Sequence, residues 1–225
     1  MTDIRETDHS VPDNIPFEQA GRYGFSKRLV LTVMMIISSP GRFFSTMHIN
    51  KGYFYPVLFM LIMLFFGNIF TYIYVNAGFI PSASENLAAM IENNPEIAGR
   101  AEYMRYFVSE EISHMDIFYG TAANFLIFIL LSLYWHLILR SLHIAINGLE
   151  ATVRIFCYSS VVALSSAVPV SSPVLNFAVY VWWSYLVYKG ISESHEVSGR
   201  LALRGLSVCL FASFIPLILA TVAFL

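Results

Sequence analysis

The chain has 225 residues, of which 57% are hydrophobic and only 12% are charged, and its formal net charge is −2. Soluble domains carry about 25% charged residues, so this composition, with a mean hydropathy of +0.64, excludes a water-soluble globular protein. The near-neutral charge argues against nucleic-acid binding. Cys157 and Cys209 lie in separate apolar stretches without zinc-ligand spacing, so we expect no disulfide framework, metal site or cofactor. A small helical membrane protein remains.

Residues 1–25 are the polar beginning of the chain, with five acidic residues, two arginines and no apolar run. Such a segment cannot bury enough apolar surface to fold alone, so we expect a disordered tail. It lacks the basic and apolar regions of a secretory signal peptide, so we expect the chain to enter the membrane through its own spans.

The segment 26–52 contains a short apolar stretch, Leu29–Ile37, which Pro40 and Gly41 terminate. Nine residues rise only about 14 Å in a helix, under half of the ~30 Å hydrocarbon core, so we expect an interfacial amphipathic helix. The alternative is a helix buried against the bundle. The basic residues that flank it, as expected headgroup contacts, are Lys27, Arg28 and Arg42.

Residues 53–225 are expected to form a membrane domain of about five spanning helices, because five apolar stretches have capping, aromatic or charged flanks. In the loop 77–117, Ser82 and Glu85 predict a capping box, and Asn94-Pro95 opens a second amphipathic helix. The expected fold class is all-α, an integral membrane helical bundle. The five predicted spans are residues 53–76, 118–139, 153–172, 174–188 and 205–225.

The distribution of Lys and Arg predicts how these spans are oriented. With five spans, alternate sides of the membrane hold 11 and 2 of the 13 basic residues. The positive-inside rule then places the N-terminus in the cytoplasm and the C-terminus outside. The loop 77–117, with seven acidic residues and two arginines, is therefore expected to be extracytoplasmic.

Few polar residues interrupt the predicted spans. Arg154 is the one charged residue, near the cytoplasmic end of the third span, and we expect it to snorkel to lipid phosphate because a charge at the bilayer centre costs at least about 2.5 kcal/mol. Asn68, Asn124 and Asn176 lie in the outer halves of three spans. They form either a shared outward-facing pocket or interhelical hydrogen bonds worth about 0.6 kcal/mol each.

Small residues recur at four-residue spacing on two of the spans, a pattern that allows close helix packing in membranes. Whether these faces pack on each other or on a second copy of the chain stays open. The two stripes are Ser159, Ala163 and Ala167 in the third span, and Gly205, Cys209 and Ser213 in the fifth.

No enzymatic motif accompanies these features. The sequence lacks a GxSxG elbow, an HExxH pair, a Walker loop, a dinucleotide-binding glycine run and an acid pair within the spans. The serines of the third span have only His136 as a base within the helical interiors. We therefore expect the protein not to be an enzyme.

Three stretches of the sequence resemble the Yip domain family, named for Ypt/Rab-interacting membrane proteins. They are SSPGRFF (Ser38 to Phe44), the span that begins YFYPVLF, and the run from GLEATVRIFCYSS to WWSYLVYKGISESHEVSGRLALRG. The resemblance covers about Ser26 to Pro216 and implies a polytopic membrane protein that acts as an adaptor. Its strongest positions are Gly148, Arg154, Tyr158, Pro169, Trp183, Gly190, His195, Ser198 and Ala202.

The chain looks most similar to compact prokaryotic members of that family, which implies a bacterial cytoplasmic (inner) membrane, with a Golgi or ER membrane as the alternative. The tail of about 25 residues carries no counterpart of the aromatic-acidic motifs of eukaryotic members. This departure argues against a Rab-type GTPase as a partner.

Three functional hypotheses follow. The first is a non-enzymatic adaptor or scaffold, either a homo-oligomer or an accessory subunit of a larger membrane complex. The second is a carrier for lipid or a small uncharged solute that uses the asparagine pocket, and the third is a membrane-shaping protein with Leu29–Ile37 as its wedge. The expected cytoplasmic contacts of the adaptor are Lys27, Arg28, Arg42, His195 and Arg200.

Overall fold

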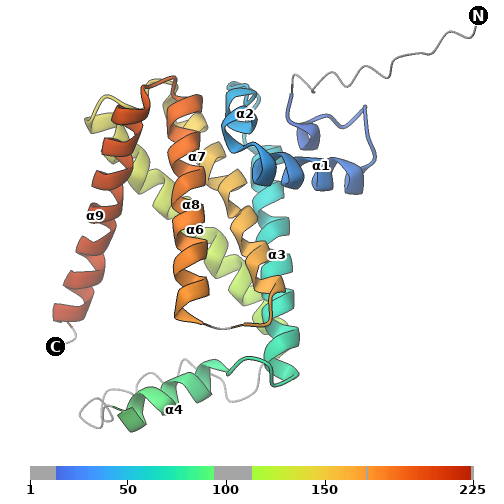
Figure 1. The fold of residues 1–225 in the computed structure, drawn as a ribbon, viewed down its shortest axis with the longest axis vertical. Coiled ribbons are helices and arrows are strands. Elements are labelled where there is room, and N and C mark those ends of the chain that lie inside the picture. Colours follow the sequence, from blue (N-terminus) through green and yellow to red (C-terminus); the bar gives the residue numbers. More distant parts are fainter. Residues whose placement is uncertain (1–13, 94–112, 171, 224–225) are drawn as a thin grey trace, which may run out of the picture.

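The computed structural model describes residues 14–93, 113–170 and 172–223, which form helices and connecting loops without any strand. Five helical segments lie alongside one another in the bundle (Figure 1). The all-α fold class is thus confirmed over these residues. The five segments are α3 (Phe54–Asn76), α6 (His114–Ser141), α7 (Gly148–Ser159) continued by the 3-10 helix η3 (Ser160–Ala167), α8 (Pro173–Ser194) and α9 (Gly199–Ala223).

Two of the described helices, α3 and α6, are long and apolar enough to cross a membrane. They have 23 and 28 residues, and the mean hydropathy of each reaches 2.0 in its most apolar window. At about 1.5 Å per residue, both exceed the ~30 Å hydrocarbon core. The prediction of five membrane spans is not confirmed by this criterion.

The third predicted span, residues 153–172, differs from a continuous α-helix. The α-helix ends at Ser159, and the chain continues as η3 to Ala167. This segment packs closely on α3 at Gly67, where an added Cβ would lie 3.0 Å from the carbonyl oxygen and 3.2 Å from the Cβ of Ala163. The absence of a side chain at Gly67 therefore allows the two backbones to approach.

The second and fourth predicted spans are longer than expected. The helix α6 begins at His114 because Ser113 and Asp116 form a capping box, a signal that the sequence interpretation missed. The helix α8 extends to Ser194, six residues beyond the predicted end, and has 22 residues. At its start, the hydroxyl of Ser172 accepts the backbone N–H of Leu175 at 3.1 Å.

The helix α1 (Phe25–Ser38) lies crosswise to the long helices, at the end of the bundle where α3 begins (Figure 1). One of its faces is buried through Thr32 and Ile36, whereas Met34 is 61% exposed. The short helix α2 (Pro40–Ser45) follows and packs against α8. The expected interfacial helix therefore has one face on the protein and an apolar face outside it.

The prediction of a disordered tail over residues 1–25 is wrong for residues 14–25, and residues 1–13 lie outside the described part. Pro16–Glu18 forms the 3-10 helix η1, and the side chain of Phe17 is fully buried. The backbone N–H of Phe17 donates to Thr32 Oγ1 at 2.9 Å, and its ring packs against Phe59 with centroids 5.6 Å apart. The contacts of this one aromatic side chain therefore hold in place a segment whose average composition is polar.

The loop between the first two long helices carries α4 (Ala83–Asn93), which stands apart from the bundle (Figure 1). Its capping box is confirmed, because the Ser82 N–H donates to Glu85 Oε2 at 2.6 Å and the Glu85 N–H donates to Ser82 Oγ at 3.2 Å. The second helix predicted from Asn94-Pro95 lies outside the described residues.

Candidate functional site

Arg154 of α7 is the centre of a charged cluster at the end of the bundle where α1 and α2 lie. Its side chain is fully buried, and Nη2 forms an ion pair with Glu18 of η1. The hydroxyl of Tyr158, one turn later on α7, donates to the same carboxylate oxygen at 2.5 Å. Nη1 of Arg154 donates to the carbonyl oxygen of Gly52 at 3.0 Å. The cluster therefore joins the N-terminal segment, the loop before α3, and α7.

Glu150 extends this cluster on the first turn of α7. Its Oε1 lies 3.6 Å from Arg154 Nη1 and accepts the backbone N–H groups of Lys51 at 3.1 Å and Gly52 at 3.0 Å. The arginine thus faces two carboxylates, while one of these also fixes the loop that leads into α3. The arrangement is closed around Arg154, which has no exposed surface for a ligand.

The prediction that Arg154 snorkels to lipid phosphate is wrong. Transferring an arginine out of water is costly unless a counter-ion and hydrogen-bond acceptors accompany it, and here Glu18 and Gly52 supply both. Sequence reasoning missed Glu18 because it lies in the segment expected to be disordered. The available signal was the short run Ile15-Pro16-Phe17 directly before it, whose three side chains are all buried.

A second polar network connects α6, α7 and the end of α8. Thr152 Oγ1 lies 3.0 Å from Nδ1 of His136 and 3.2 Å from Nε2 of His195, and all three side chains are buried. The backbone N–H of Asn147 donates to Nδ1 of His195 at 3.3 Å. A neutral His195 ring therefore carries its proton on Nε2 and donates it to Thr152 Oγ1. The Thr152 hydroxyl in turn donates its own proton to Nδ1 of His136.

The expected role of His195 as a cytoplasmic contact is wrong, because its side chain is 0% exposed. Burial, and secondarily the nearby His136, lower the pKa of His195 to about 4, so the imidazole is neutral at pH 7. The residue acts as an internal hydrogen-bond link at the C-terminal end of α8.

The other predicted basic contacts are divided between surface and interior. Lys27, Arg42 and Arg200 are exposed. Arg28 is half-buried, and its Nη1 donates to the carbonyl oxygen of Phe17 at 3.1 Å. Arg28 and Arg154 were both expected to contact lipid headgroups. In the structure, both instead hold the N-terminal segment in place.

The three asparagines have different surroundings. Asn68 Nδ2 donates to Thr121 Oγ1 at 3.2 Å, which is an interhelical hydrogen bond between α3 and α6. Asn124 is partly buried on α6, and Asn176 is exposed near the start of α8. For Asn68 the structure therefore matches the interhelical alternative, and a single pocket built from all three amides receives no support.

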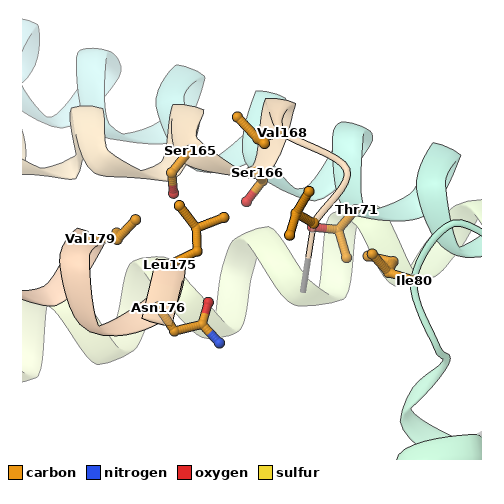
Figure 2. A pocket seen from close by; sticks show the side chains of 9 residues that line it. Thr71, Ile80, Ser165, Ser166, Val168, Leu175, Asn176 and Val179 are labelled. Carbon is orange, nitrogen blue, oxygen red and sulfur yellow. The ribbon is translucent and has the colours of Figure 1, made fainter. Parts of the chain in front are cut away.

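Asn176 lines a cavity of about 150 Å³ between α3, η3 and the start of α8 (Figure 2). Thr71, Ser165 and Ser166 contribute polar atoms to its lining, and Ile80 lies at its edge. At about 30 Å³ per water molecule, the volume corresponds to about five waters and is too small for a lipid chain.

The two stripes of small residues pack on different helices of the same chain. In the third-span stripe, Ala163 meets Gly67 of α3, and the Ala167 carbonyl accepts the hydroxyl of Tyr74 at 2.7 Å; Ser159 is fully buried. The fifth-span stripe faces α6 instead. Its contacts are those of Gly205 with Leu139, Cys209 with the Trp135 carbonyl, and Ser213 with Trp135 Nε1 at 2.9 Å.

Within the described ranges, no group of three or more His, Cys, Asp or Glu side chains is placed to hold a metal ion. Cys157 and Cys209 are free thiols and both are buried. The polar chemistry of the described bundle is therefore concentrated in the Arg154 cluster and the Thr152 network.

Comparison with known proteins adds the family. The sequence model of the Yip1 domain matches residues 34–221, which include Arg154, Thr152 and both buried histidines, whereas Glu18 precedes the match. Neither a curated protein nor a solved structure matches the chain. The family and the apolar helices α3 and α6 agree with an integral membrane protein. The match covers most of the chain, which therefore belongs to the Yip1 domain family.

Proposed function

We propose that this integral membrane protein is a non-enzymatic adaptor or scaffold of Yip type. The observation that carries the proposal is that the buried groups capable of acid-base chemistry, Glu18, His136 and His195, bind other parts of the chain and connect its helices. Buried hydrogen bonds and ion pairs of this kind stabilise one arrangement of the backbone. General acid-base catalysis instead requires a group within reach of a substrate.

The proposed topology has five spans, with the N-terminus in the cytoplasm and the C-terminus outside. The 22 residues of α8 and the 25 residues of α9 rise about 33 and 37 Å, enough to cross the hydrocarbon core. The α7–η3 segment, with 20 residues, extends about 34 Å because a 3-10 helix rises about 2.0 Å per residue. The proposed location is the bacterial cytoplasmic membrane, with a Golgi or ER membrane as the alternative.

The proposed interaction surface is the outer face of α9. Val208, Phe211 and Ile215 follow one another at helical spacing and are exposed, with Phe211 76% exposed. An aromatic, apolar helix face of this kind suits contact with a second copy of the chain or with another membrane subunit. We therefore propose a homo-oligomer or a larger membrane complex, and we do not propose a Rab-type GTPase as partner.

The test is gentle extraction from the native membrane followed by native mass spectrometry of the intact complex. The adaptor hypothesis predicts a discrete complex that contains a second copy or another subunit, and Phe211→Ala should reduce its yield. Leu126→Ala on α6, at a position 56% exposed, is the matched control and should leave the complex intact. Recovery of monomers alone, both in detergent and in native membrane discs, would contradict the proposal.

A carrier function is a second candidate because of the cavity lined by Asn176, Thr71 and the two serines. Its volume of about 150 Å³ and its uncharged lining suit a small uncharged polar molecule better than a lipid. Uptake of glycerol into proteoliposomes, compared between the wild type and Asn176→Leu, distinguishes the hypotheses. Uptake that the variant abolishes without changing the oligomer would favour the carrier.

Membrane shaping is a third candidate, and it is favoured by the exposed apolar face of α1. Val30, Met34 and Ile37 are 52%, 61% and 53% exposed, and α1 lies crosswise to the long helices as an interfacial wedge would (Figure 1). Met34→Asp should abolish the remodelling of liposomes by such a wedge. Remodelling at the wild-type level in this variant would exclude the mechanism.

A further inference from the structure

An apolar groove of about 400 Å³ lies on the face of α3 beside the start of α1. Phe25 and Phe66 on its walls are 49% and 40% exposed. The exposure of such an apolar surface to water is unfavourable. A hydrocarbon chain that covers the groove removes this surface from water and thereby lowers the free energy. The groove is lined by Phe25 of α1, Leu61, Ile62, Phe65 and Phe66 of α3, and Thr121 of α6.

The groove lies at the depth that one lipid chain occupies. It is built mainly on α3 and reaches α6, the two described helices that are apolar enough to cross a membrane. Leu61 and Phe66 come seven and twelve residues after the first residue of α3, which is about 11 and 18 Å along its axis. The groove thus extends from near the α1 end of the bundle toward the middle of the hydrocarbon core.

Positive charge gathers at the α1 end of this groove. Arg22 and Lys27 are exposed, and the Arg22 guanidinium carbon and Lys27 Nζ lie 5.4 and 5.1 Å from the ring centroid of Tyr23. The Arg28 guanidinium carbon lies 5.9 Å from the ring of Phe25, which forms part of the groove wall. Arg28 Nε is buried and has no hydrogen-bond partner among the described residues.

Among the described residues, Arg22, Lys27 and Arg28 form no ion pair with a carboxylate. The sequence contains no Asp or Glu between Glu18 and Glu85, and Glu18 is already bound to Arg154 inside the bundle. A phosphate or other anion at this position therefore meets basic side chains beside the apolar groove, of which Arg28 contacts the wall residue Phe25. This combination complements an anionic lipid better than a zwitterionic one.

We propose that the groove binds one acyl chain of an anionic glycerophospholipid from the leaflet on the α1 side, with the headgroup held by Arg22, Lys27 and Arg28. The site would retain this lipid during gentle extraction and would fix α1 at the level of the headgroups. The proposal concerns a lipid site on the single chain, so it does not depend on the adaptor function or on the oligomeric state.

Native mass spectrometry of the full-length protein, equilibrated with equal amounts of phosphatidylglycerol and phosphatidylethanolamine, tests the site. We expect one retained phosphatidylglycerol per chain, in excess over phosphatidylethanolamine. In Arg22→Gln/Lys27→Gln the retained phosphatidylglycerol should fall about 25-fold, because each of the two basic residues contributes a factor of about five to binding of an anionic headgroup. Arg200→Gln/Arg204→Gln, at two exposed positions on α9, is the matched control.

A second variant tests the groove itself. Leu61→Trp places a large side chain on the groove wall and should reduce retention of both lipids at this site, while the melting temperature verifies that the variant is folded. Equal retention of the two lipids by the wild type would overturn the proposal. So would the same loss of phosphatidylglycerol in the α9 control, or unchanged retention in both Leu61→Trp and the Arg22/Lys27 variant.

Discussion

The α1 end and the middle of the helix bundle are held together by different kinds of contact. At the α1 end, the Glu18–Arg154 ion pair joins residues 136 positions apart, and Thr152 joins two buried histidines. In the middle of the bundle, α3 meets η3 through the close contact at Gly67 and meets α6 through the Asn68–Thr121 hydrogen bond. The α1 end relies on buried polar networks, and the middle on close backbone packing.

This difference has a physical consequence for how each region tolerates substitutions. Removing one member of a buried charged pair leaves the other without compensation and costs several kcal/mol. Crowding a well-packed apolar contact by one methyl group costs about 1–3 kcal/mol, because neighbouring side chains relax in part. The α1 end should therefore be the more sensitive of the two to single substitutions.

The largest effect is expected for Glu18→Ala. It leaves the fully buried guanidinium of Arg154 without its closest counter-ion, and the free energy of unfolding should fall by about 3–5 kcal/mol. Unfolding in mixed detergent micelles at increasing SDS fraction measures this loss. Glu92→Gln, at an exposed position on α4, is the control and should change stability by less than about 0.5 kcal/mol.

The double variant Glu18→Gln/Arg154→Met sharpens this test. Because it removes both charges, it should recover a large part of the stability that Glu18→Ala loses. A loss of under about 1 kcal/mol in Glu18→Ala alone would mean that the ion pair does not hold the N-terminal segment.

The histidine network predicts a dependence on pH. The pKa of His195 is about 4 in the folded protein and near 6.5 in the unfolded chain, so the unfolded chain binds the proton first as the pH falls. The stability that this group contributes is complete above about pH 6.5 and is lost toward pH 4, by up to about 3 kcal/mol. The difference in unfolding free energy between the wild type and His195→Gln should shrink over that window, and a constant difference would contradict the prediction.

In the middle of the bundle, Gly67→Ala should destabilise the contact between α3 and η3. The new Cβ would lie 3.0 Å from the backbone oxygen of Ala163, which cannot rotate away. The free energy of unfolding, measured by thermal unfolding, should therefore fall by about 1–2 kcal/mol. Gly24→Ala is the control, because no atom lies within 4 Å of the Cβ it would add. A loss of stability in Gly67→Ala equal to that in Glu18→Ala would remove the contrast between the two regions.

The smallest effect is expected for Ser82→Ala at the start of α4. Hydrogen bonds from the Ser82 backbone and side chain lower the pKa of Glu85, and loss of the hydroxyl should move that pKa back toward its ordinary value. The first-turn amides of α4 should exchange with solvent about fivefold faster, because Ser82 caps them. Hydrogen exchange of α6 should not change, which separates local fraying from a change in the bundle.

The sequence was a good guide to helices whose signals are local. Apolar length defined α3, and the pair Ser82 and Glu85 defined the start of α4, because each signal lies within one or two helical turns. Polar contacts across long sequence distances were missed. Nothing within the vicinity of Arg154 indicates that its counter-ion comes from Glu18, and the polar composition of residues 1–25 suggested the opposite.

The same limit explains the errors at the candidate sites. His195 was expected at the surface because the sequence around it is polar, yet the fold brings it against Thr152 of α7, 43 positions away. The stripes were correctly identified as small-residue faces in the sequence, but their neighbours, α3 and α6, depend on topology. The turn to a 3-10 helix after Ser159 has no distinct local signal among the small and β-branched residues that form it.

The position of Glu18 has a consequence for biosynthesis. Because a ribosome makes Glu18 long before Arg154 and Tyr158, the N-terminal segment cannot reach its final place until α7 has been synthesised and has joined α3. The emerging protein therefore carries Glu18 without its Arg154 and Tyr158 partners through the insertion of its first spans, although Phe17 can already contact Thr32 and Phe59. Closure of the Glu18–Arg154 pair is a late step of assembly, and it distinguishes a completed chain from one truncated before residue 154.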